Sequence, residues 1–336
     1  MSLSSIINNI PKAELHLHIE GSLTPELMWR LAKKHSVTLP YASVKEIEAA
    51  YNFEDLQSFL DLYYAGAGVL RDEEDFFTLM WEYLSRCHKE NIVHTEIMFD
   101  PQTHTERDIG FDVFMPGFLR AMDKAKQEYG ISSYLIMSFL RHLPESAAFE
   151  TLSEAEPYYK HITAVGLDSS ELGHPPSKFE RVFKKAKSLG FKIVAHAGEE
   201  GPASYIWEAI ELLDVDRIDH GVRCQEDKAL MALLRERQIP LTVCPLSNLK
   251  LCVIDDMKQH NIVELLNEGL LVTVNSDDPT YFGGFLNDNF VALQESLNID
   301  EDTIRTLAAN SFKSSFLPED VKRSFVEKVF NVRKSL

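Results

Sequence analysis

Strand-like and helical stretches alternate along this chain, and this alternation constrains the fold more than any other feature. The strand-like runs are 92–99, 132–140, 164–167, 191–195, 217–219, 240–243 and 270–274. The helical stretches between them are 113–128, 145–160, 177–189, 203–213, 226–237 and 255–268. With a first strand at about residues 12–20, ended by Gly21, eight strands each precede a helix, which predicts a parallel sheet. Eight such units predict a closed α/β structure, the (β/α)8 TIM barrel.

The length of the chain is compatible with one domain. It has 336 residues, and α/β barrels of this size commonly form a single unit, so we expect one domain over residues 1–336. Residues 41–89 predict a helical insertion after the first strand, because they are too long for one barrel connection. Within it, residues 59–64 are apolar enough to form a lid over a site. The tail from about residue 286 to 330 is typical of extra C-terminal helices.

Charge and cysteine content exclude several classes of partner. Lys and Arg number 34 against 52 Asp and Glu, a net charge of -18, and such a surface repels nucleic acid and anionic membranes. The four cysteines form no C-x-x-C pair, and no secretory signal precedes them, so we predict reduced thiols in a cytoplasmic protein. No run approaches the length of a membrane-spanning helix. The composition leaves the oligomeric state open, and a homo-oligomer is compatible with it.

In a barrel of this kind, the active site lies at the carboxyl ends of the strands. Polar clusters occur at four of the predicted ends. They are His16-Leu17-His18-Ile19-Glu20, His196-Ala197-Gly198-Glu199-Glu200, Asp219-His220-Gly221 and Asn275-Ser276-Asp277-Asp278-Pro279. Although these segments are far apart in the sequence, a barrel brings them to one mouth.

Four residues of these clusters form a candidate metal site. His16 and His18 are two residues apart on a strand, so their imidazoles point to the same face. Together with His196 and Asp277 they supply three nitrogens and one oxygen. This set suits zinc or a similar divalent ion, with one position left for water. We therefore expect one zinc ion per chain.

Two further residues are candidates for proton transfer. His220 ends the strand next to that of His196, where it can accept a proton from water activated by the metal. Glu199 follows His196 by three residues and can carry a proton to the substrate. Each histidine alone would be an ordinary core residue, but polar groups at four strand ends together indicate a catalytic site.

The same motifs resemble those of the adenosine and adenine deaminase family. The similar segments are 14–21, 196–199, 219–221, 244–248 and 276–279, which read ELHLHIEG, HAGE, DHG, CPLSN and SDDP. They follow the order of the family from about residue 11 to 310. The resemblance implies a (β/α)8 barrel with one zinc ion, bound by His16, His18, His196 and Asp277. It also implies that Glu199 protonates N1 of a purine, that His220 orients and deprotonates the water, and that Asp278 bonds N7.

Within this family, Glu20 favours the adenine-specific branch. Nucleoside deaminases of the family carry aspartate at this position, where it serves the ribose. The longer Glu20 would enter the space of a ribose, and its carboxylate would accept the N9 hydrogen of a free base. Segments 244–252 and 274–284 are also similar to this branch. The resemblance thus implies an adenine deaminase, a hydrolase that converts adenine to hypoxanthine and ammonia in purine salvage and nucleotide metabolism, with adenosine and N6-substituted adenines as alternative substrates.

Three other classes are weaker interpretations. A binuclear amidohydrolase usually has a lysine at the end of the fourth strand, and residues 165–172 contain none. Zinc deaminases with an H-x-E motif also need a P-C-x-x-C motif, which this sequence lacks. A non-catalytic purine-binding barrel would lack a proton-transfer residue, whereas Glu199 and His220 are both present.

Overall fold

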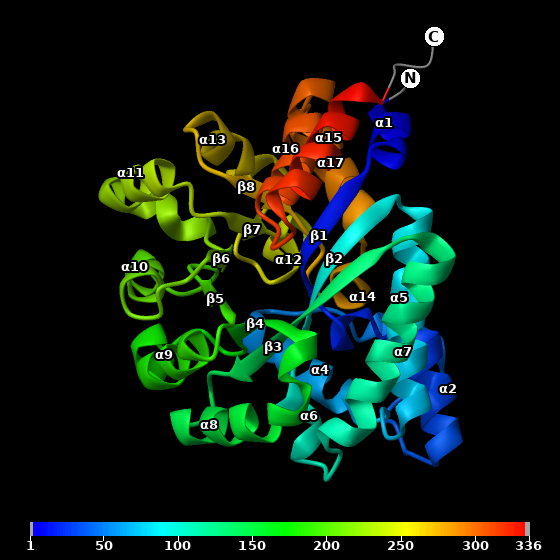
Figure 1. Cartoon of the computed structure of the whole chain (residues 1–336). Coiled ribbons are helices and arrows are strands. Elements are labelled where there is room, and N and C mark those ends of the chain that lie inside the picture. Colours follow the sequence, from blue (N-terminus) through cyan, green and yellow to red (C-terminus); the bar gives the residue numbers. More distant parts are fainter. Residues whose placement is uncertain (1–2, 333–336) are drawn as a thin grey trace.

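Eight parallel strands, hydrogen-bonded in chain order from β1 to β8, form the centre of the molecule (Figure 1). A computed structural model describes residues 3–332 of the chain. Within these residues the strands are β1 (Lys12–His18), β2 (Ile92–Phe99), β3 (Ser132–Leu140), β4 (Ile162–Asp168), β5 (Lys192–Ala197), β6 (Arg217–His220), β7 (Leu241–Val243) and β8 (Val272–Val274). Helices connect successive strands, as right-handed parallel crossovers require. The predicted (β/α)8 barrel is confirmed.

The barrel closes where β1 meets the segment that follows β8. Leu17 and Asp277 form a parallel bridge across this seam. The N–H of His18 donates to the carbonyl of Asp277 (3.0 Å), and the N–H of Asp277 donates to the carbonyl of His16 (3.1 Å). The seam therefore places the beginning and the end of the barrel side by side, and with them three of the candidate site residues.

The two faces of the strands explain the pattern of apolar residues. Leu15 and Leu17 belong to the large core between the barrel and its helices, as expected for a parallel sheet that is covered by helices. A small second cluster fills the barrel interior and consists of Met98, Ile136, Ala164 and Val194. Because His16 and His18 alternate with the two leucines, they share the inward face.

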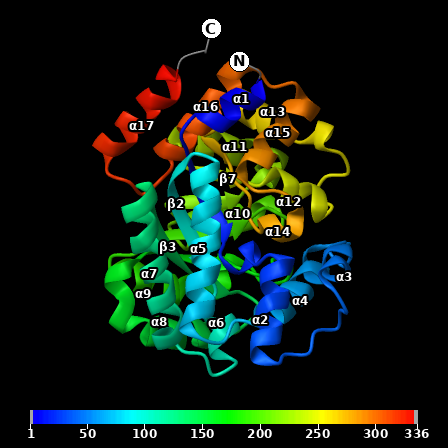
Figure 2. The same ribbon diagram turned by 90° about the vertical axis from the view of Figure 1, so that its right-hand side faces the viewer.

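Helices cover the outside of the barrel (Figures 1 and 2). In residues 3–332, the α-helices before β5 are α1 (Leu3–Asn9), α2 (Pro25–His35), α3 (Val44–Ala49), α4 (Leu56–Ala67), α5 (Glu73–Lys89), α6 (Pro101–Thr105), α7 (Phe111–Tyr129), α8 (Glu145–Glu154) and α9 (Glu180–Ser188). Those after β5 are α10 (Ala203–Glu211), α11 (Lys228–Arg237), α12 (Pro245–Lys250), α13 (Ile262–Asn267), α14 (Pro279–Phe282), α15 (Leu286–Leu297), α16 (Glu301–Lys313) and α17 (Glu319–Asn331). Across the described residues, none of these helices combines the length and the apolar character needed to cross a membrane.

The helix after β1 shows how the sequence sets the limits of an element. The Thr24 hydroxyl accepts a hydrogen bond from the N–H of Leu27 (3.2 Å), and Pro25 occupies the first turn of α2. Both features are typical of helix starts. The helix ends after His35, where Ser36 adopts a left-handed conformation with φ 54°. These signals determine the first and the last residue of α2.

The predicted helical insertion consists of several separate elements. Residues 41–89 contain α3, α4 and α5, with irregular segments at 50–55 and 68–72 between them. Asp55 and Asp72 each cap the following helix with a side-chain oxygen. A residue in this capping position has a non-helical backbone, so it separates two helices instead of continuing one. The assignment of residues 1–336 to one domain stays a prediction.

Two other boundaries differ from the sequence-based expectation. The helix expected at 255–268 is reduced to α13, preceded by a short 3₁₀ turn, because His260 Nδ1 accepts from the N–H of Ile262 (3.1 Å), the first residue of α13. β1 ends at His18, because the hydroxyl of Ser22 donates to the carbonyl of Ile19 (2.7 Å) and closes a 3₁₀ turn, η1 (Glu20–Ser22). Glu20 therefore lies in a turn and not on the strand.

α4 lies at the carboxyl end of the barrel. It packs against η1 and α6, which follow β1 and β2 respectively. Figures 1 and 2 show α4 and α6 at the end of the molecule that is opposite α1 and α17. The insertion therefore contributes a cover over the end of the barrel where an active site is expected.

Candidate active site

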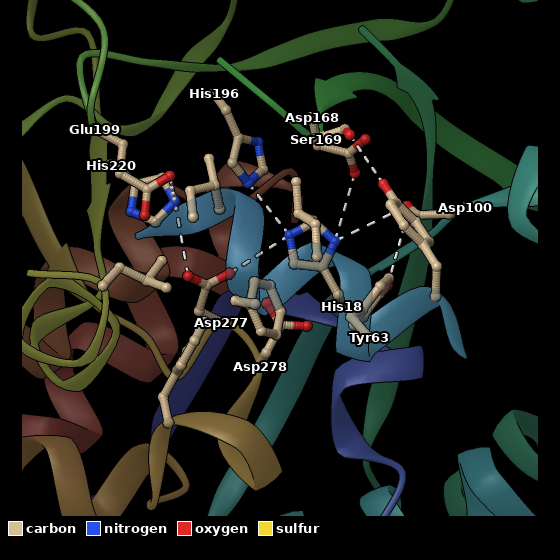
Figure 3. Close-up of a pocket in the computed structure, with 16 residues that line it drawn as sticks. His18, Tyr63, Asp100, Asp168, Ser169, His196, Glu199, His220, Asp277 and Asp278 are labelled. Carbon is tan, nitrogen blue, oxygen red and sulfur yellow. Dashed lines mark hydrogen bonds and ion pairs between the residues drawn. The ribbon is translucent and has the colours of Figure 1, made fainter. Parts of the chain in front are cut away.

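Four buried side chains converge at the mouth of the barrel. His16 and His18 end β1, His196 lies on β5, and Asp277 follows β8. Asp277 Oδ1 lies 3.1 Å from His16 Nε2 and 3.5 Å from His18 Nε2. The Nε2 atoms of His18 and His196 are 3.2 Å apart, and Figure 3 shows both imidazoles pointing toward Asp277. The ligand atoms of all four residues lie within 4.8 Å of one another.

The ring nitrogen of His16 that points away from the four-residue cluster is fixed by a hydrogen bond. Its Nδ1 lies 3.0 Å from the hydroxyl oxygen of Thr242, and this hydroxyl donates to Asp219 Oδ1 (2.9 Å). Because the hydroxyl proton is used on Asp219, its oxygen accepts from His16, and the imidazole proton lies on Nδ1. Nε2 then keeps its lone pair for a ligand on the inner side.

Carboxylates also face the outer nitrogens of the other two imidazoles. Asp219 Oδ2 lies 3.6 Å from His196 Nδ1, and Asp168 Oδ2 lies 3.5 Å from His18 Nδ1. Carboxylates in this position commonly fix the tautomer and the ring orientation of histidines that bind metals. All three imidazoles are thus oriented with Nε2 inward.

The inward atoms fit a divalent metal ion. His16 Nε2 is buried and has no hydrogen-bond partner in the structure. With protons on the outer nitrogens, the three inward nitrogens are all acceptors and require a cation or a donor between them. Three imidazole nitrogens and one carboxylate oxygen are ligands that zinc and similar ions prefer. The structure therefore brings together the four residues that the sequence predicts as ligands.

The two candidates for proton transfer lie together on one side of this cluster (Figure 3). His220 Nε2 lies 3.5 Å from Glu199 Oε2 and 3.7 Å from Asp277 Oδ2. Burial lowers the pKa of His220 to about 3, so its imidazole is neutral and can accept a proton. Burial and the charge of Asp277 raise the pKa of Glu199 well above its usual range. This shift favours the protonated form of Glu199, which can donate.

The loop that carries Glu199 is fixed by a second buried carboxylate. Glu171 accepts hydrogen bonds from four successive backbone N–H groups, those of residues 198–201, at 2.7, 3.1, 2.9 and 2.7 Å. Such charge-assisted bonds to backbone N–H groups are strong. They hold the turn after β5 in one conformation, and with it the side chain of Glu199.

Asp278 is a buried hydrogen-bonding group next to the cluster. Its Oδ1 has no partner among the described residues, and burial raises the pKa of Asp278 well above its usual range. A Cβ atom at Gly21 would lie 1.9 Å from this oxygen, so glycine is required at that position. Asp278 therefore offers a proton to a ligand, in the place where the family resemblance expects N7 of a purine.

Two site residues occupy the left-handed region of the backbone. The φ angles are 63° at His220 and 62° at Asp277. Residues other than glycine seldom adopt this conformation, and it concentrates at functional sites where the surrounding structure enforces it. At Asp277 the enforcing contacts are the two backbone hydrogen bonds to β1.

A cavity of about 370 Å³ lies over these residues. One wall comes from α4 and is formed by Leu56, Phe59, Leu60, Tyr63 and Tyr64. The segment 59–64, which the sequence predicts as a lid, thus contributes most of this wall. Only a small part of this volume admits the centre of a water molecule, so the cavity is narrow. The cavity therefore suits a small ligand.

The position of Glu20 differs from the expectation. Its Oε1 accepts from His104 Nε2 (2.7 Å) and from the N–H of Asp100 (3.4 Å), and its Oε2 accepts from the Tyr63 hydroxyl (3.4 Å). Among the described residues that line the cavity, Glu20 does not occur. The first strand, expected to reach residue 20, ends before Glu20, because the chain turns at Ile19 and Glu20 lies in η1. Its expected contact with N9 stays a prediction.

The sequence analysis missed two buried carboxylates beside His18. Asp100 follows β2 and Asp168 ends β4, and both line the cavity. They lie 3.9 and 3.5 Å from His18 Nδ1. Burial and the charge of Asp100 raise the pKa of Asp168 well above its usual range. Both residues stand at carboxyl ends of strands, which is the signal that would have found them.

Comparison with known proteins extends these observations to nearly the whole chain. A family model described as adenosine deaminase matches residues 11–332. The chain is 59% identical to an adenine deaminase of Acinetobacter baylyi, over 98% of this chain and 99% of that protein. It is 58% identical to an adenine deaminase of Wolinella succinogenes, again over 98% and 99%. The crystal structure of an adenine deaminase from Arthrobacter aurescens superposes with a TM-score of 0.94 at 47% identity, covering 96% of this chain and 98% of that one.

Proposed function

The chain belongs to the adenosine deaminase family and is a hydrolytic deaminase, and we propose that it converts adenine to hypoxanthine and ammonia in purine salvage. One observation carries this proposal. Glu199, whose pKa is raised, and His220, whose pKa is lowered, lie together beside a cluster of three histidines and one aspartate. This arrangement delivers a proton to one atom of a ring and removes a proton from water at the neighbouring atom. The similarity to proteins named adenine deaminase supports the choice of substrate.

The residues of the site divide the proton transfers between them. Attack of water at C6 of the purine breaks its aromaticity and places negative charge on N1. Glu199 donates its proton to N1 as this charge develops, while His220 orients the water and accepts its proton. Asp278 donates to N7 and so aligns the ring with C6 over the site. His220 then returns its proton to the amino group, which leaves C6 as ammonia, while Glu199 takes up the proton of the new hydroxyl, and the 6-oxo product forms.

We propose that His16, His18, His196 and Asp277 hold one zinc ion per chain. When bound, such an ion supplies Lewis-acid activation of water at neutral pH. The donor types and their inward orientation support zinc over ions that prefer oxygen ligands alone. We also propose a cytoplasmic location, because the four cysteines of the chain are unpaired thiols in the structure.

The kcat/KM for adenine is expected to exceed that for adenosine by roughly 10⁴-fold. Discrimination of this size is usual for sites built to hydrogen-bond a substrate N–H. The narrow cavity has a wall of α4 side chains and favours a base, because a ribose on N9 would collide with that wall. The measurement is a set of initial rates on adenine, adenosine and N6-methyladenine, followed by purine absorbance and by ammonia release.

The same panel separates the alternatives. Comparable efficiencies on adenine and adenosine would contradict the proposal and identify a nucleoside deaminase. Faster turnover of N6-methyladenine, with release of methylamine, would identify a deaminase of N6-substituted adenines. Turnover of none of these substrates by protein loaded with metal would point to a different amidohydrolase activity.

Asp278→Ala is expected to raise KM and to lower kcat/KM by roughly 10- to 100-fold, the usual effect of losing a buried hydrogen bond that involves a charged or strongly polar group. The metal content should not change, since Asp278 is not one of the four clustered ligands. Asp278→Asn is the matched control, because its amide N–H can still donate to N7, and it should retain more of the activity. Loss of metal in Asp278→Ala, or an unchanged KM, would contradict this role.

A further inference from the structure

Asp100 is a buried carboxylate in the wall of the cavity that the mechanism above does not use. Its Oδ2 accepts a hydrogen bond from the Tyr63 hydroxyl (3.0 Å). Its Oδ1 is buried and has no hydrogen-bond partner among the described residues, and His18 Nδ1, 3.9 Å away, lies beyond hydrogen-bonding distance. A buried carboxylate oxygen without a donor is unfavourable, so one that faces a cavity indicates a donor on the ligand.

A chain of hydrogen bonds holds Asp100 in this position. Arg107 donates to His104 Nδ1 (2.9 Å), which leaves the proton of His104 on Nε2, where it donates to Glu20 (2.7 Å). Glu20 in turn accepts from the backbone N–H of Asp100 (3.4 Å) and from the hydroxyl of Tyr63 (3.4 Å). Glu20 thus makes its contacts inside the protein, where its Oε2 shares the single Tyr63 hydrogen with Asp100 Oδ2, whereas Asp100 Oδ1 has no donor and its residue lines the cavity.

Asp168, the other carboxylate beside His18, has a different task. Its Oδ2 lies 3.5 Å from His18 Nδ1, which is the position of a group that orients a metal-binding imidazole. Asp100 lies farther from this nitrogen and is tied to Tyr63 instead. The oxygens of Asp168 also lack a hydrogen-bond partner among the described residues, but one of them faces a candidate metal ligand, so we assign the contact with substrate to Asp100.

The location of Asp100 matches one edge of the purine. Figure 3 shows Asp100 on the far side of His18 from Glu199 and His220. A purine with N1 at Glu199 and N7 at Asp278 directs the other nitrogen of its five-membered ring, N9, away from Glu199. In free adenine this N9 carries a hydrogen, which is the one ring N–H without an assigned acceptor.

We propose that Asp100, and not Glu20, accepts the N9–H of the free base, with Glu20 as a positioning residue behind it. The inference rests on the adenine deaminase function proposed above and names the residue that makes the site specific for a base without a sugar. A substituent on N9 removes the donor and also collides with the pair of Asp100 and Tyr63. The carboxylate oxygen is then left buried without a partner, which is how such sites reject an analogue.

The test compares adenine with 9-methyladenine, which differs from it at N9 alone. For the wild-type protein we expect a ratio of kcat/KM of roughly 10³ or more in favour of adenine. Asp100→Ala removes the acceptor and makes space, and Asp100→Asn keeps the shape but removes the charge. Both should lower the ratio, by on the order of 100-fold and 10-fold respectively. Glu20→Gln is the matched control, because its amide oxygen still accepts from His104, and it should change the ratio far less.

Product binding supplies a readout that does not depend on turnover. The affinities for hypoxanthine and 9-methylhypoxanthine, measured by calorimetry, should differ in the wild-type protein and converge in both Asp100 variants. Each ratio compares two ligands on one preparation, so incomplete metal loading affects both values alike. If Asp100→Ala fails to fold, the ratios measured for Asp100→Asn still test whether Asp100 accepts the N9–H.

Two results would overturn the assignment of Asp100. One is an unchanged ratio in Asp100→Asn, and the other is a ratio that collapses in Glu20→Gln but not in the Asp100 variants. Failure of the wild-type protein to deaminate adenine would instead overturn the proposed function. In that case the affinities for hypoxanthine and 9-methylhypoxanthine still test whether Asp100 recognises the N9–H.

Discussion

Replacing His16 by alanine is expected to abolish metal binding and deaminase activity together. The variant loses one of three nitrogens, the one that lies 3.1 Å from Asp277 Oδ1, and keeps an incomplete set of ligands. Removal of a group that only supports a ligand already costs roughly 10- to 100-fold in metal affinity, so removal of the ligand itself should cost more. Elemental analysis should find about one equivalent of zinc in the wild-type protein and almost none in His16→Ala.

His88→Ala is the matched control for this variant. His88 is exposed and stacks on Tyr129 with ring centroids 4.3 Å apart, so its loss should leave metal and activity intact. Treatment with a chelator should inactivate the wild-type protein, and zinc should restore it but not His16→Ala. A full equivalent of metal in His16→Ala would contradict the assignment of this ligand. Two equivalents in the wild-type protein would favour a binuclear site.

Much of the candidate site follows from two periodicities that a sequence displays. Alternation along β1 places His16 and His18 on one face, and the parallel barrel gathers the carboxyl ends of all strands at one rim. These two rules suffice to bring His196, His220 and Asp277 near β1, although long stretches of chain separate them. The structure shows the same residues in contact, because the backbone bridge at Asp277 closes the barrel at that point.

Other parts of the site depend on contacts that no local pattern specifies. The alternation that places His18 does not extend to Glu20, because the hydroxyl of Ser22 closes a turn at Ile19. The pairing of Thr242 with His16 joins β7 to β1, and nothing in either strand's own sequence indicates it. Such details are set by the packing of distant segments, so they required the structure.

The lid illustrates the same limit. Its apolar character is visible in residues 59–64, but the identity of the surface that it covers is not. In the structure Tyr63 reaches the carboxylates of Asp100 and Glu20, and Tyr64 donates to Ser169 (2.9 Å). These two hydroxyl groups connect the insertion to the ends of three strands, and only that connection shows α4 to be part of the binding cavity.

The second large effect is expected for Glu199→Gln, which should lower kcat by roughly 10²- to 10⁴-fold, the usual contribution of a general acid. Because burial and Asp277 raise the pKa of Glu199, its neutral form is favoured, and glutamine replaces that form with nearly the same shape and charge. The amide can still donate a hydrogen bond to N1 but cannot transfer a proton at this acidity. The metal content and the affinity for hypoxanthine should therefore change little, while turnover falls.

Glu200→Gln is the matched control, since it makes the same change one residue along the chain. Glu200 accepts a bond from the N–H of Leu56 (3.0 Å) through an oxygen that glutamine also possesses, so turnover should stay close to that of the wild-type protein. Near-normal kcat in Glu199→Gln would exclude Glu199 as the acid. A loss of metal in Glu199→Gln would show instead that the side chain supports the ligands. A selective loss of kcat, with metal and product binding retained, is the result that proton transfer to N1 requires, because only that step depends on an acidic hydrogen at this position.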